Sequence, residues 1–532
     1  MKVKRREFIV GVSALAGLSA FPVAPVRAAA AKHTRYNVTS EQGKAMLKSY
    51  AVAIEKMVNL PPTHPHNWFR NAFVHFMDCP HGNWWFYVWH RGYVGFFEQT
   101  VRSLSGNPNF AFPYWDWTQT PEIPEGMFDG VLTPVDKAFQ PYTKDLDTFT
   151  AYIKPTMQAY WNGLSKAQRQ QLDARGYTDF NLLWNDVTGY DPSTGKIVPG
   201  NQGFAATERA RYLSRDNPKL DDKTAHACSP DVIRAGLAPT LFHSPDVAGS
   251  FTSSKTPSHN TMPGKGTSFS VLEGQPHNLV HNGIGGVGPW NPGPYGNMTN
   301  FLSPVDPVFF LHHANMDRLW SVWEGKQRKQ GLPVLPTDKT ELDQLVRERF
   351  LFFVRADGTF VTDGKAGDYL STDRFEYDYA PGFGDGEGMQ VAAATARKPG
   401  RPVKGTVKAG VGSVTLAGAP TGPVVAAVTV PRSADPTAAR EYDVLVNAPA
   451  GVTEAGADSP YYAGTVGFFG PAMPGMAHDA TFAVPLPQRL QAMTTLNQTN
   501  KQASATLEFR LVPAYDKSAA APAVKAVSVH TL

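Results

Sequence analysis

Six of the histidines fall into two sets of three, and imidazole is the commonest protein ligand of transition metals. The sets are His75, His81 and His90 in one stretch of the chain and His277, His281 and His313 in another. Three neutral rings bind copper, zinc or iron and leave the ion open to substrate or dioxygen. Two such sets predict a dinuclear metal site.

His277 and His281 stand four residues apart, so on a helix both rings face the same way and can bind one ion. In the helical zinc-protease motif a glutamate follows the first histidine, but here that residue is Asn278. A zinc hydrolase of that type is therefore excluded.

The histidines need rigid elements to position them. Apolar residues recur at helical spacing over 40–60, with Ser40 as the expected N-cap, and large apolar residues fill expected helices over 84–101 and 307–327. Facing helices are how helical bundles build metal sites. The pattern predicts a mainly α catalytic domain, a four-helix bundle that holds both metal ions.

After about residue 382 the sequence changes character. Gly- and Pro-rich stretches alternate with short β-branched runs, which lie at 424–430, 442–446, 481–484 and 505–511. Such runs with turn residues between them are typical of strands in an all-β sandwich. This second domain contains few histidines, so we expect the metal chemistry in the first.

The composition is that of a globular protein with a large core. The chain has 532 residues, 42% of them hydrophobic and 18% charged, with 11 Trp and 31 Phe. Residues 1–30 hold five basic residues and one acidic residue, so the rest of the chain carries 45 of each. This balance gives no support for a nucleic-acid partner or a charged membrane surface. With only Cys79 and Cys228, neither a disulfide scaffold nor a cysteine zinc ribbon can organise the fold.

The N-terminus carries a pattern typical of export. Lys4, Arg5 and Arg6 precede an uncharged apolar stretch over 11–26, and three alanines follow at 28–30, as at a signal cleavage site. The pattern resembles a twin-arginine signal, which predicts a bacterial protein exported in folded form to the periplasm or the medium. A membrane anchor is the alternative, but the stretch is short and no later segment reaches about 18 apolar residues.

These patterns set the expected domain boundaries. Residues 1–30 form the signal peptide, 31–385 the catalytic domain, 386–435 a linker with the first strands, and 436–532 the C-terminal sandwich. Residues near 519–525, rich in Ala and Lys, are expected to be a loose tail.

The segments around the histidines resemble those of the type 3 copper proteins. They are Cys79-Pro80-His81, Trp89-His90-Arg91, Phe97-Glu98, Pro113-Tyr114-Trp115-Asp116-Trp117, Pro276-His277-Asn278-Leu279-Val280-His281 and the run from Asp306-Pro307 to Leu319-Trp320. The tyrosinase and polyphenol oxidase branch is the most similar, in order and spacing, over about residues 75–320. The resemblance implies two copper ions, with dioxygen as co-substrate.

The resemblance also implies which residues bind the copper. His75, His81 and His90 would bind the first ion, and His277, His281 and His313 the second. In the family the second member of the His-His pair is the ligand, which leaves His312 a supporting role. His64 and His66 are rivals of His75, but the family places the first ligand just upstream of a Cys-x-His, which favours His75.

Other residues of these segments acquire expected roles in the same way. Cys79 stands two residues before His81, the arrangement in which fungal tyrosinases and molluscan hemocyanins form a Cys–His thioether. The alternatives are a free thiol and a disulfide with Cys228. Structural support of the ligand helices is expected from a set of charged residues, which are Arg91, Glu98, Asp116, Asp317 and Arg318.

Glu273 and Asn278 are the candidate catalytic pair. Glu273 precedes His277 by four residues, where plant-type enzymes have a water-holding glutamate. Together the two side chains could polarise a water that takes the proton of a phenol, a general-base step that ortho-hydroxylation requires. The alternative is that Glu273 only hydrogen-bonds its own helix. Phe301 aligns with a gate residue over the first copper, which would favour small diphenols.

The C-terminal part resembles the plant-type domain that covers the active site of a latent enzyme until proteolysis releases it. Tyr377-Asp378-Tyr379 resembles the tyrosine motif that ends the catalytic domain, with Arg35 as expected partner, and 441–447 resembles the opening of the C-terminal domain. In the family a loop residue of this domain occupies the place of substrate. The candidates within 467–476, which the sequence does not rank, are Phe468, Phe469, Met473 and Met476. The alternative is that these side chains only fill the interface.

The function that the resemblance implies is a copper oxidase that ortho-hydroxylates monophenols and oxidises o-diphenols to o-quinones, latent until the C-terminal domain is removed. A catechol oxidase or an o-aminophenol oxidase without monophenolase activity is the nearest alternative, and an oxygen carrier of the hemocyanin type a more distant one. The expected partners are small phenols and the twin-arginine export machinery, with no nucleic acid and no stable membrane anchor. No oligomeric state is predicted.

Overall fold

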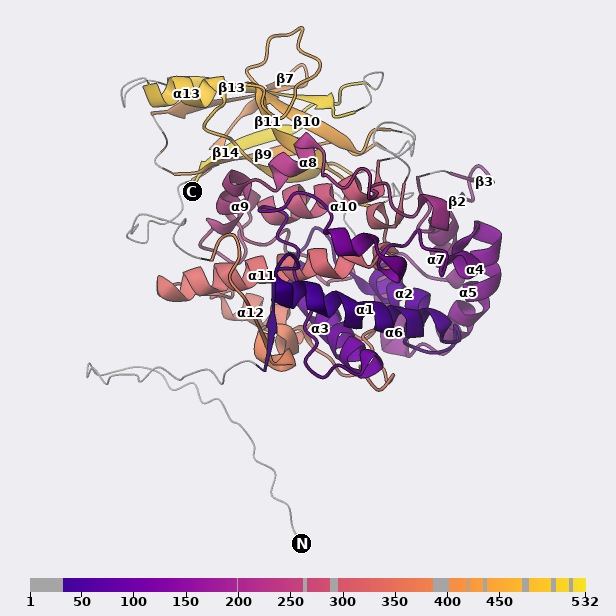
Figure 1. Ribbon diagram of the computed structural model, residues 1–532. Coiled ribbons are helices and arrows are strands. Elements are labelled where there is room, and N and C mark those ends of the chain that lie inside the picture. The colour runs from indigo at the N-terminus through magenta and orange to yellow at the C-terminus, as the bar shows by residue number, and fades with distance from the viewer. Residues whose placement is uncertain are drawn as a thin grey trace, which may run out of the picture.

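The computed structural model consists of a helical region and a β-sandwich that rests on it (Figure 1). The structure describes residues 32–198, 200–261, 266–287, 295–385, 401–418, 420, 422–433, 438–470, 478–498, 504–515 and 520–532. The expected signal peptide and the candidates Met473 and Met476 lie outside the described residues. The predicted fold class, a mainly α domain followed by an all-β sandwich, is confirmed.

The described part of the helical region contains twelve α-helices, four of which carry histidines of the two sets. They are α1 (Glu41–Asn59), α2 (Trp68–Asp78), α3 (Phe86–Ser105), α4 (Gln140–Thr143), α5 (Leu146–Asn162), α6 (Lys166–Ala174), α7 (Phe180–Thr188), α8 (Asp222–Ala227), α9 (Pro230–Leu237), α10 (Asn278–Gly285), α11 (Val308–Lys329) and α12 (Lys339–Arg347). The helices predicted over 40–60, 84–101 and 307–327 correspond to α1, α3 and α11. Ser40 caps α1 by accepting a hydrogen bond from the backbone of Gly43.

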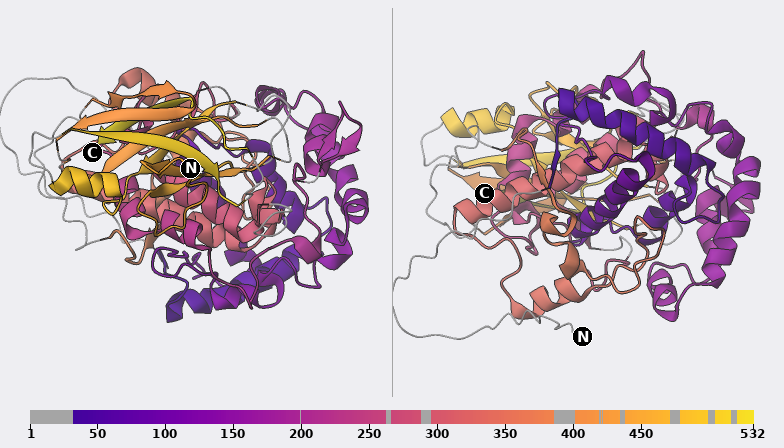
Figure 2. Two further views of the ribbon diagram at one scale, coloured as in Figure 1. Left: turned by 90° about the horizontal axis from the view of Figure 1, so that it is seen from above. Right: turned by 60° about the horizontal axis from the view of Figure 1, so that its bottom comes forward.

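Helices α2, α3, α10 and α11 form the bundle, and each carries at least one histidine of the two sets (Figure 2). Helix α11 packs against α3, and nearly all of its residues are buried. Between α2 and α3 the chain leaves the helical conformation at Cys79, because a residue before proline is disfavoured in a helix. His81 therefore lies in a loop, and α3 begins at Phe86, slightly later than predicted.

The sandwich has two sheets, with strand orders β11-β10-β13-β8-β7 and β4-β12-β9-β14-β6. The strands are β4 (Thr267–Phe269), β6 (Val403–Lys404), β7 (Thr406–Lys408), β8 (Val411–Ala417), β9 (Val424–Val430), β10 (Glu441–Val446), β11 (Tyr462–Gly467), β12 (Ala480–Pro485), β13 (Ser504–Pro513) and β14 (Ala526–Thr531), with helix α13 (Gln491–Gln498) beside them. The four predicted strands correspond to β9, β10, β12 and β13. Strand β14 was not predicted: it follows the expected tail and lies between β9 and β6, with Val527 and Val529 buried.

The two regions share structure across their boundary. Strand β4 belongs to the helical region in sequence, yet it pairs in parallel with β12 of the sandwich. Phe269 of β4 stacks on Phe482, with ring centroids 4.9 Å apart, and lies in the sandwich core. In return, Phe469 of the sandwich packs in the core of the helical region. The sandwich is thus docked by one strand pairing and by two aromatic rings, each of which packs in the core of the other region.

The first and last segments of the helical region are tied together beside the bundle. Strand β1 (His33–Arg35) pairs in parallel with β5 (Tyr377–Tyr379), so the expected partnership of Arg35 with the tyrosine motif is present. Arg35 stacks on Tyr377 at 3.5 Å and donates to Glu98 at 2.8 Å. Burial alone would raise the pKa of Asp317, but the guanidinium groups of Arg91 and Arg35 hold it below its ordinary value. Among the described residues, no helix is long and apolar enough to span a membrane.

Candidate metal centre

The first cluster consists of His75, Cys79, His81 and His90. His75 lies on α2, Cys79 follows it, His81 lies on the loop and His90 on α3. One donor atom from each of the four lies within 4.8 Å of all the others, and all four residues are buried. These residues are up to 15 positions apart in the sequence, and the bend at Cys79 brings their donor atoms together.

The second cluster consists of His277, His281, His312 and His313, again with donor atoms within 4.8 Å of one another. His277 ends a π-helical turn (Glu273–His277) that leads into α10, where His281 follows. A π turn inside a helix is rare and is frequent at functional sites. The other two histidines come from α11, so two helices supply the cluster.

The two clusters face each other. The rings of His90 and His313 stack with centroids 4.1 Å apart and an interplanar angle of 11°. His81 and His277 lie 5.7 Å apart on the other side. The six predicted histidines are therefore brought together in one buried site, whereas His64 and His66 contact each other and the backbone of Ala356 instead.

Hydrogen bonds fix which ring nitrogen each histidine presents. The Nδ1 atoms of four rings bond to oxygen acceptors: His75 to Phe301 O at 2.7 Å, His90 to Phe86 O at 2.7 Å, His281 to Met298 O at 2.6 Å and His277 to Asn278 Oδ1 at 2.9 Å. A carbonyl oxygen can only accept, so Nδ1 carries the proton and Nε2 keeps its lone pair. The Nε2 atoms of His75 and His277 are buried without a partner. Such fixed rings with orphaned nitrogens are typical of metal ligands.

His312 and His313 differ in the nitrogen that remains available. Trp117 donates its indole N–H to Nδ1 of His312 at 3.1 Å, so in the neutral ring the proton lies on Nε2. His313 instead directs Nε2 at Nε2 of His281, 3.2 Å away. Two imidazole nitrogens that face each other at this distance suit a shared cation, which favours His313 as ligand and His312 as support.

Burial keeps these imidazoles neutral. Desolvation lowers the pKa of His75 and of His277 to about 3, and it also lowers the pKa of the other cluster histidines. A neutral ring is the form that binds metal. Two buried groups of three neutral imidazoles, with no carboxylate ligand among them, fit a pair of copper ions by donor type.

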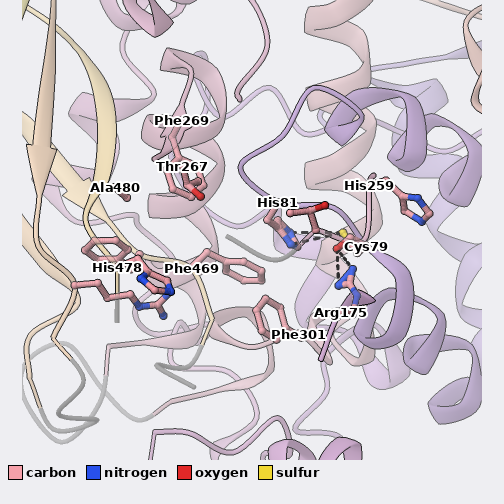
Figure 3. A pocket seen from close by; sticks show the side chains of 13 residues that line it. Cys79, His81, Arg175, His259, Thr267, Phe269, Phe301, Phe469, His478 and Ala480 are labelled. Carbon is pink, nitrogen blue, oxygen red and sulfur yellow. Dashed lines mark hydrogen bonds between the residues drawn. The ribbon is translucent and has the colours of Figure 1, made fainter. Parts of the chain in front are cut away.

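Cys79 lies against the ring of His81. Its sulfur is 3.6 Å from Nε2 and 3.8 Å from Nδ1 of that ring, and 3.3 Å from Nε2 of His90. Arg175 donates to the carbonyl of Cys79 at 3.0 Å and holds the loop (Figure 3). No disulfide joins Cys79 to Cys228, and both are buried, which excludes the disulfide alternative.

Glu273 reaches the same loop from the π turn. The backbone N–H of Gly82 donates to its Oε1 at 2.6 Å, and the hydroxyl of Ser253 donates to its Oε2. Burial raises the pKa of Glu273 to about 8. Both carboxylate oxygens thus accept hydrogen bonds from the protein, and one of these bonds orients the residue after His81.

Asn278 connects His277 to the sandwich. While its Oδ1 accepts from the His277 ring, its Nδ2 donates to the carbonyl of Gly467 at 2.9 Å. Gln275 and Asn282, on either side of it, also donate to carbonyls of the sandwich. Roles for Arg175, Gln275 and Asn282 were not predicted, because each depends on a contact with a segment distant in sequence.

The two phenylalanines at the end of β11 have different surroundings. Phe469 enters the metal site, with its ring centroid 4.7 Å from His81, 4.5 Å from His281 and 5.5 Å from Phe301 (Figure 3). Phe468 turns back into the sandwich and packs edge-on against Phe482 at 5.2 Å. Phe301 faces Phe469 across the pocket and also lies 5.9 Å from His81.

The charged residues expected to support the bundle do so. Arg91 donates to Asp317 at 2.6 Å and stacks on Trp320, while Arg318 pairs with Asp385 at 2.7 Å and lies 3.7 Å from Asp116. None of these carboxylates belongs to either histidine cluster.

Comparison with known proteins shows which proteins this chain is similar to. Residues 33–326, more than half of the chain, match the family model described as the common central domain of tyrosinase. A chloroplastic polyphenol oxidase of Malus domestica is 26% identical over 352 residues, which are 63% of this chain and 46% of the relative. The chloroplastic (+)-larreatricin hydroxylase of Larrea tridentata is 27% identical over 295 residues, 52% of this chain and 39% of the relative. The chain thus spans less than half the length of these curated relatives.

Solved structures share the whole layout. A recombinant latent aurone synthase, described as a polyphenol oxidase, superposes with a TM-score of 0.52 at 19% identity, covering 97% of this chain and 92% of that chain. The same protein from its natural source gives 0.52 at 18% identity. At such identities the likeness shows the fold, including the sandwich on the helical region.

Proposed function

The chain belongs to the tyrosinase family, and from that premise we propose that it is an oxidase that uses dioxygen to ortho-hydroxylate monophenols and to oxidise o-diphenols to o-quinones. The observation that carries the proposal is the pair of facing histidine clusters with an aromatic ring, Phe469, at their opening. An aromatic ring is already accommodated where a phenol would have to lie.

The proposed ligands are the six histidines of the two predicted sets. His75, His81 and His90 would hold one copper ion, and His277, His281 and His313 the other, with His312 fixed by Trp117 as a positioning residue. Bound copper supplies the activation of dioxygen. The chain supplies the ring orientations, the exclusion of water from a buried site and the place of the phenol.

Glu273 and Asn278 are proposed to receive the phenolic proton through a water. Asn278 lies beside His277, and Glu273 lies on the same π turn, buried near His81. A base at this point would raise hydroxylation of monophenols more than oxidation of diphenols. Cys79 is proposed to form a thioether with His81, which the short distance between sulfur and ring supports.

A catechol oxidase or o-aminophenol oxidase is the second candidate, and one observation favours it. Both oxygens of Glu273 accept hydrogen bonds from the protein, one from the backbone of Gly82 and one from the hydroxyl of Ser253. A carboxylate whose two oxygens are already engaged in this way is a weak base for a phenol. Phe301 beside the pocket would act with it as a gate that restricts bulky phenols.

The sandwich is proposed to act as a lid that makes the enzyme latent. Of the four placeholder candidates, Phe469 is the one whose described position supports this role, because its ring lies between His81 and His281. Cleavage of the chain between residue 385 and strand β6, the linker part of 386–435, would release it. Residues 1–30 are proposed as a twin-arginine signal that exports the folded protein.

The test is oxygen uptake by the copper-loaded chain with p-cresol and with 4-methylcatechol, before and after limited proteolysis of the linker. Uptake with both substrates that rises on cleavage is the expected result. Uptake with the catechol alone would move the assignment to catechol oxidase. Reversible oxygen binding without consumption of either phenol, before and after cleavage, would identify a carrier.

A further inference from the structure

The sandwich presents an extended piece of polypeptide to the metal site. Strand β11 and the residues that follow it run along the π turn and α10, which carry His277 and His281. Three side-chain amides of that segment donate to three backbone carbonyls of the extended piece. The bonds run from Gln275 Nε2 to Thr465 O at 2.9 Å, from Asn278 Nδ2 to Gly467 O at 2.9 Å and from Asn282 Nδ2 to Phe468 O at 3.3 Å.

These three hydrogen bonds are made to backbone carbonyls and not to side chains of the extended piece. Counted from Phe469, the bonded carbonyls belong to the residues one, two and four positions before it. The spacing of the donors, 275, 278 and 282, places the amides on one side of the turn and helix, facing the strand. Any extended chain whose backbone followed the same path could accept the same three hydrogen bonds.

Glycines let this backbone come close. A Cβ on Gly467 would lie 2.7 Å from Leu279 and 3.3 Å from the amide of Asn282. Gly470 has φ +77°, and a Cβ there would lie 2.6 Å from the ring of Phe301. Glycine is therefore required one position after the inserted ring, and a side chain two positions before the ring would have to displace Leu279.

The inserted ring differs from a tyrosyl side chain by one hydroxyl group. The Phe469 ring lies within 5 Å of the rings of His81 and His281, centroid to centroid. A tyrosine on the same backbone would carry its hydroxyl farther along the same direction. The docked sandwich therefore has the geometry of a peptide-bound aromatic residue at an oxidase site.

We propose that the substrates of this site include tyrosyl side chains of extended polypeptide segments, bound through Gln275, Asn278 and Asn282 once the lid has left. The inference rests on the proposed function, because it assumes phenol oxidation at the two clusters. The preferred sequence is a tyrosine with glycine two positions before it and one position after it.

The reaction balances with dioxygen as the only co-reactant. The tyrosyl ring gives up four electrons and becomes an o-quinone. One oxygen atom forms a bond to the ring carbon ortho to the hydroxyl, replacing the C–H bond there. The other oxygen atom leaves as one water molecule, which takes the hydrogen of that C–H bond and the hydrogen of the phenol.

A first experiment uses the intact, copper-loaded chain. In the variant Phe469→Tyr the chain carries its own peptide-bound substrate, and mass spectrometry of the digested protein should find one added oxygen and two lost hydrogens on that residue. The matched control Phe468→Tyr puts the tyrosine into the sandwich core beside Phe482 and should remain unmodified. An unmodified tyrosine at position 469 in a chain that oxidises p-cresol after cleavage would overturn the inference.

A second experiment measures recognition in trans on the full chain nicked in the linker. The heptapeptide Gly-Thr-Val-Gly-Phe-Tyr-Gly copies residues 464–470 with tyrosine at the sixth position. Its kcat/KM should exceed that of N-acetyltyrosinamide by about tenfold, since each added hydrogen bond contributes modestly. Alanine in place of the second and third glycines of the peptide should abolish this advantage without any change in the enzyme.

Binding without turnover gives an independent readout. Fluorescence anisotropy of the labelled peptide on the copper-free nicked chain should show binding that weakens several-fold in Gln275→Leu. If p-cresol is oxidised but the peptide is neither bound nor preferred, the inference is wrong and the proposed function stands. If neither p-cresol nor 4-methylcatechol nor peptide is oxidised, the proposed function itself is wrong.

Discussion

The two histidine clusters are held by different parts of the molecule. The first cluster depends on the loop after α2, which Arg175 and Glu273 fasten within the helical region. The second cluster lies on the π turn, α10 and α11, and Asn278 links His277 to a carbonyl of the sandwich. Release of the sandwich should therefore alter the second cluster and leave the hydrogen bonds of the first unchanged.

The largest effect should follow from removing one ligand in each cluster. His90→Ala and His281→Ala should each leave one copper ion bound in place of two and reduce phenol oxidation below detection. The protease sensitivity of the linker distinguishes the two variants. In His90→Ala it should equal that of the parent chain, because no proposed ligand of the first cluster forms a hydrogen bond to the sandwich. An equal increase in linker cleavage in both variants would contradict the view that the two clusters are held by different parts of the molecule.

The next effect concerns the inserted ring. Phe469→Ala in the intact chain should raise oxygen uptake with 4-methylcatechol at least about tenfold without proteolysis. Loss of the ring weakens the packing of the lid, and each 1.4 kcal/mol of lost packing energy raises the population of the open pocket about tenfold. Phe468→Ala is the matched control: it removes a ring from the sandwich core and leaves Phe469 in place. Activation of both variants to the same degree would assign latency to sandwich stability alone.

Smaller effects should separate the supports of the two clusters. Asn278→Leu removes the acceptor for His277 and the donor to Gly467, so one copper ion should bind about 10- to 100-fold more weakly and the linker should be cut sooner. Arg175→Gln loosens only the Cys79 loop and should weaken copper binding without hastening cleavage. Chelator competition and timed proteolysis measure the two properties separately. Faster cleavage of the Arg175 variant would contradict the separation.

The smallest effect is a pH dependence of sandwich docking. Glu441 of β10 accepts a hydrogen bond from Asn282 at 2.7 Å, and burial raises its pKa from 4.5 to about 8. The docked state thus keeps a proton that the released sandwich gives up, so docking is strongest at low pH. It weakens as the pH rises from about 5 to about 8, by up to about tenfold per unit.

Glu441→Gln is the matched control for this prediction. The amide has the shape of the protonated carboxyl but does not titrate, so the rate of linker cleavage should lose its rise between pH 6 and pH 8, a range that ends at the pKa of about 8. The other buried acid of β10, Asp443, has a pKa raised by burial to about 6 and changes docking in the same direction. An unchanged pH profile of linker cleavage in Glu441→Gln would show that another group causes the pH dependence of docking.

Local patterns in the sequence predicted several of the elements and the six histidines that the structure brings together. The helices that carry His90 and His313 followed from apolar residues at helical spacing, and the strands β9 and β12 from β-branched runs. Strand β14 was missed because it follows an Ala-rich stretch and is specified by its neighbours β9 and β6. The candidates Phe468 and Phe469 could not be ranked, since adjacent residues of a strand point to opposite sides and the sequence does not say which side faces the metal.

The sequence by itself determined the donor chemistry of this protein. Two sets of three imidazoles, the missing glutamate after His277 and the segments around them define a copper site of one family, because ligand type and spacing are local properties. The tertiary structure decided the rest: that Phe469 enters the site, that Glu273 bonds Gly82, and that amides of the second cluster's helix bind the sandwich backbone. Those contacts join residues that lie from about 190 to about 390 positions apart, and only tertiary packing specifies them.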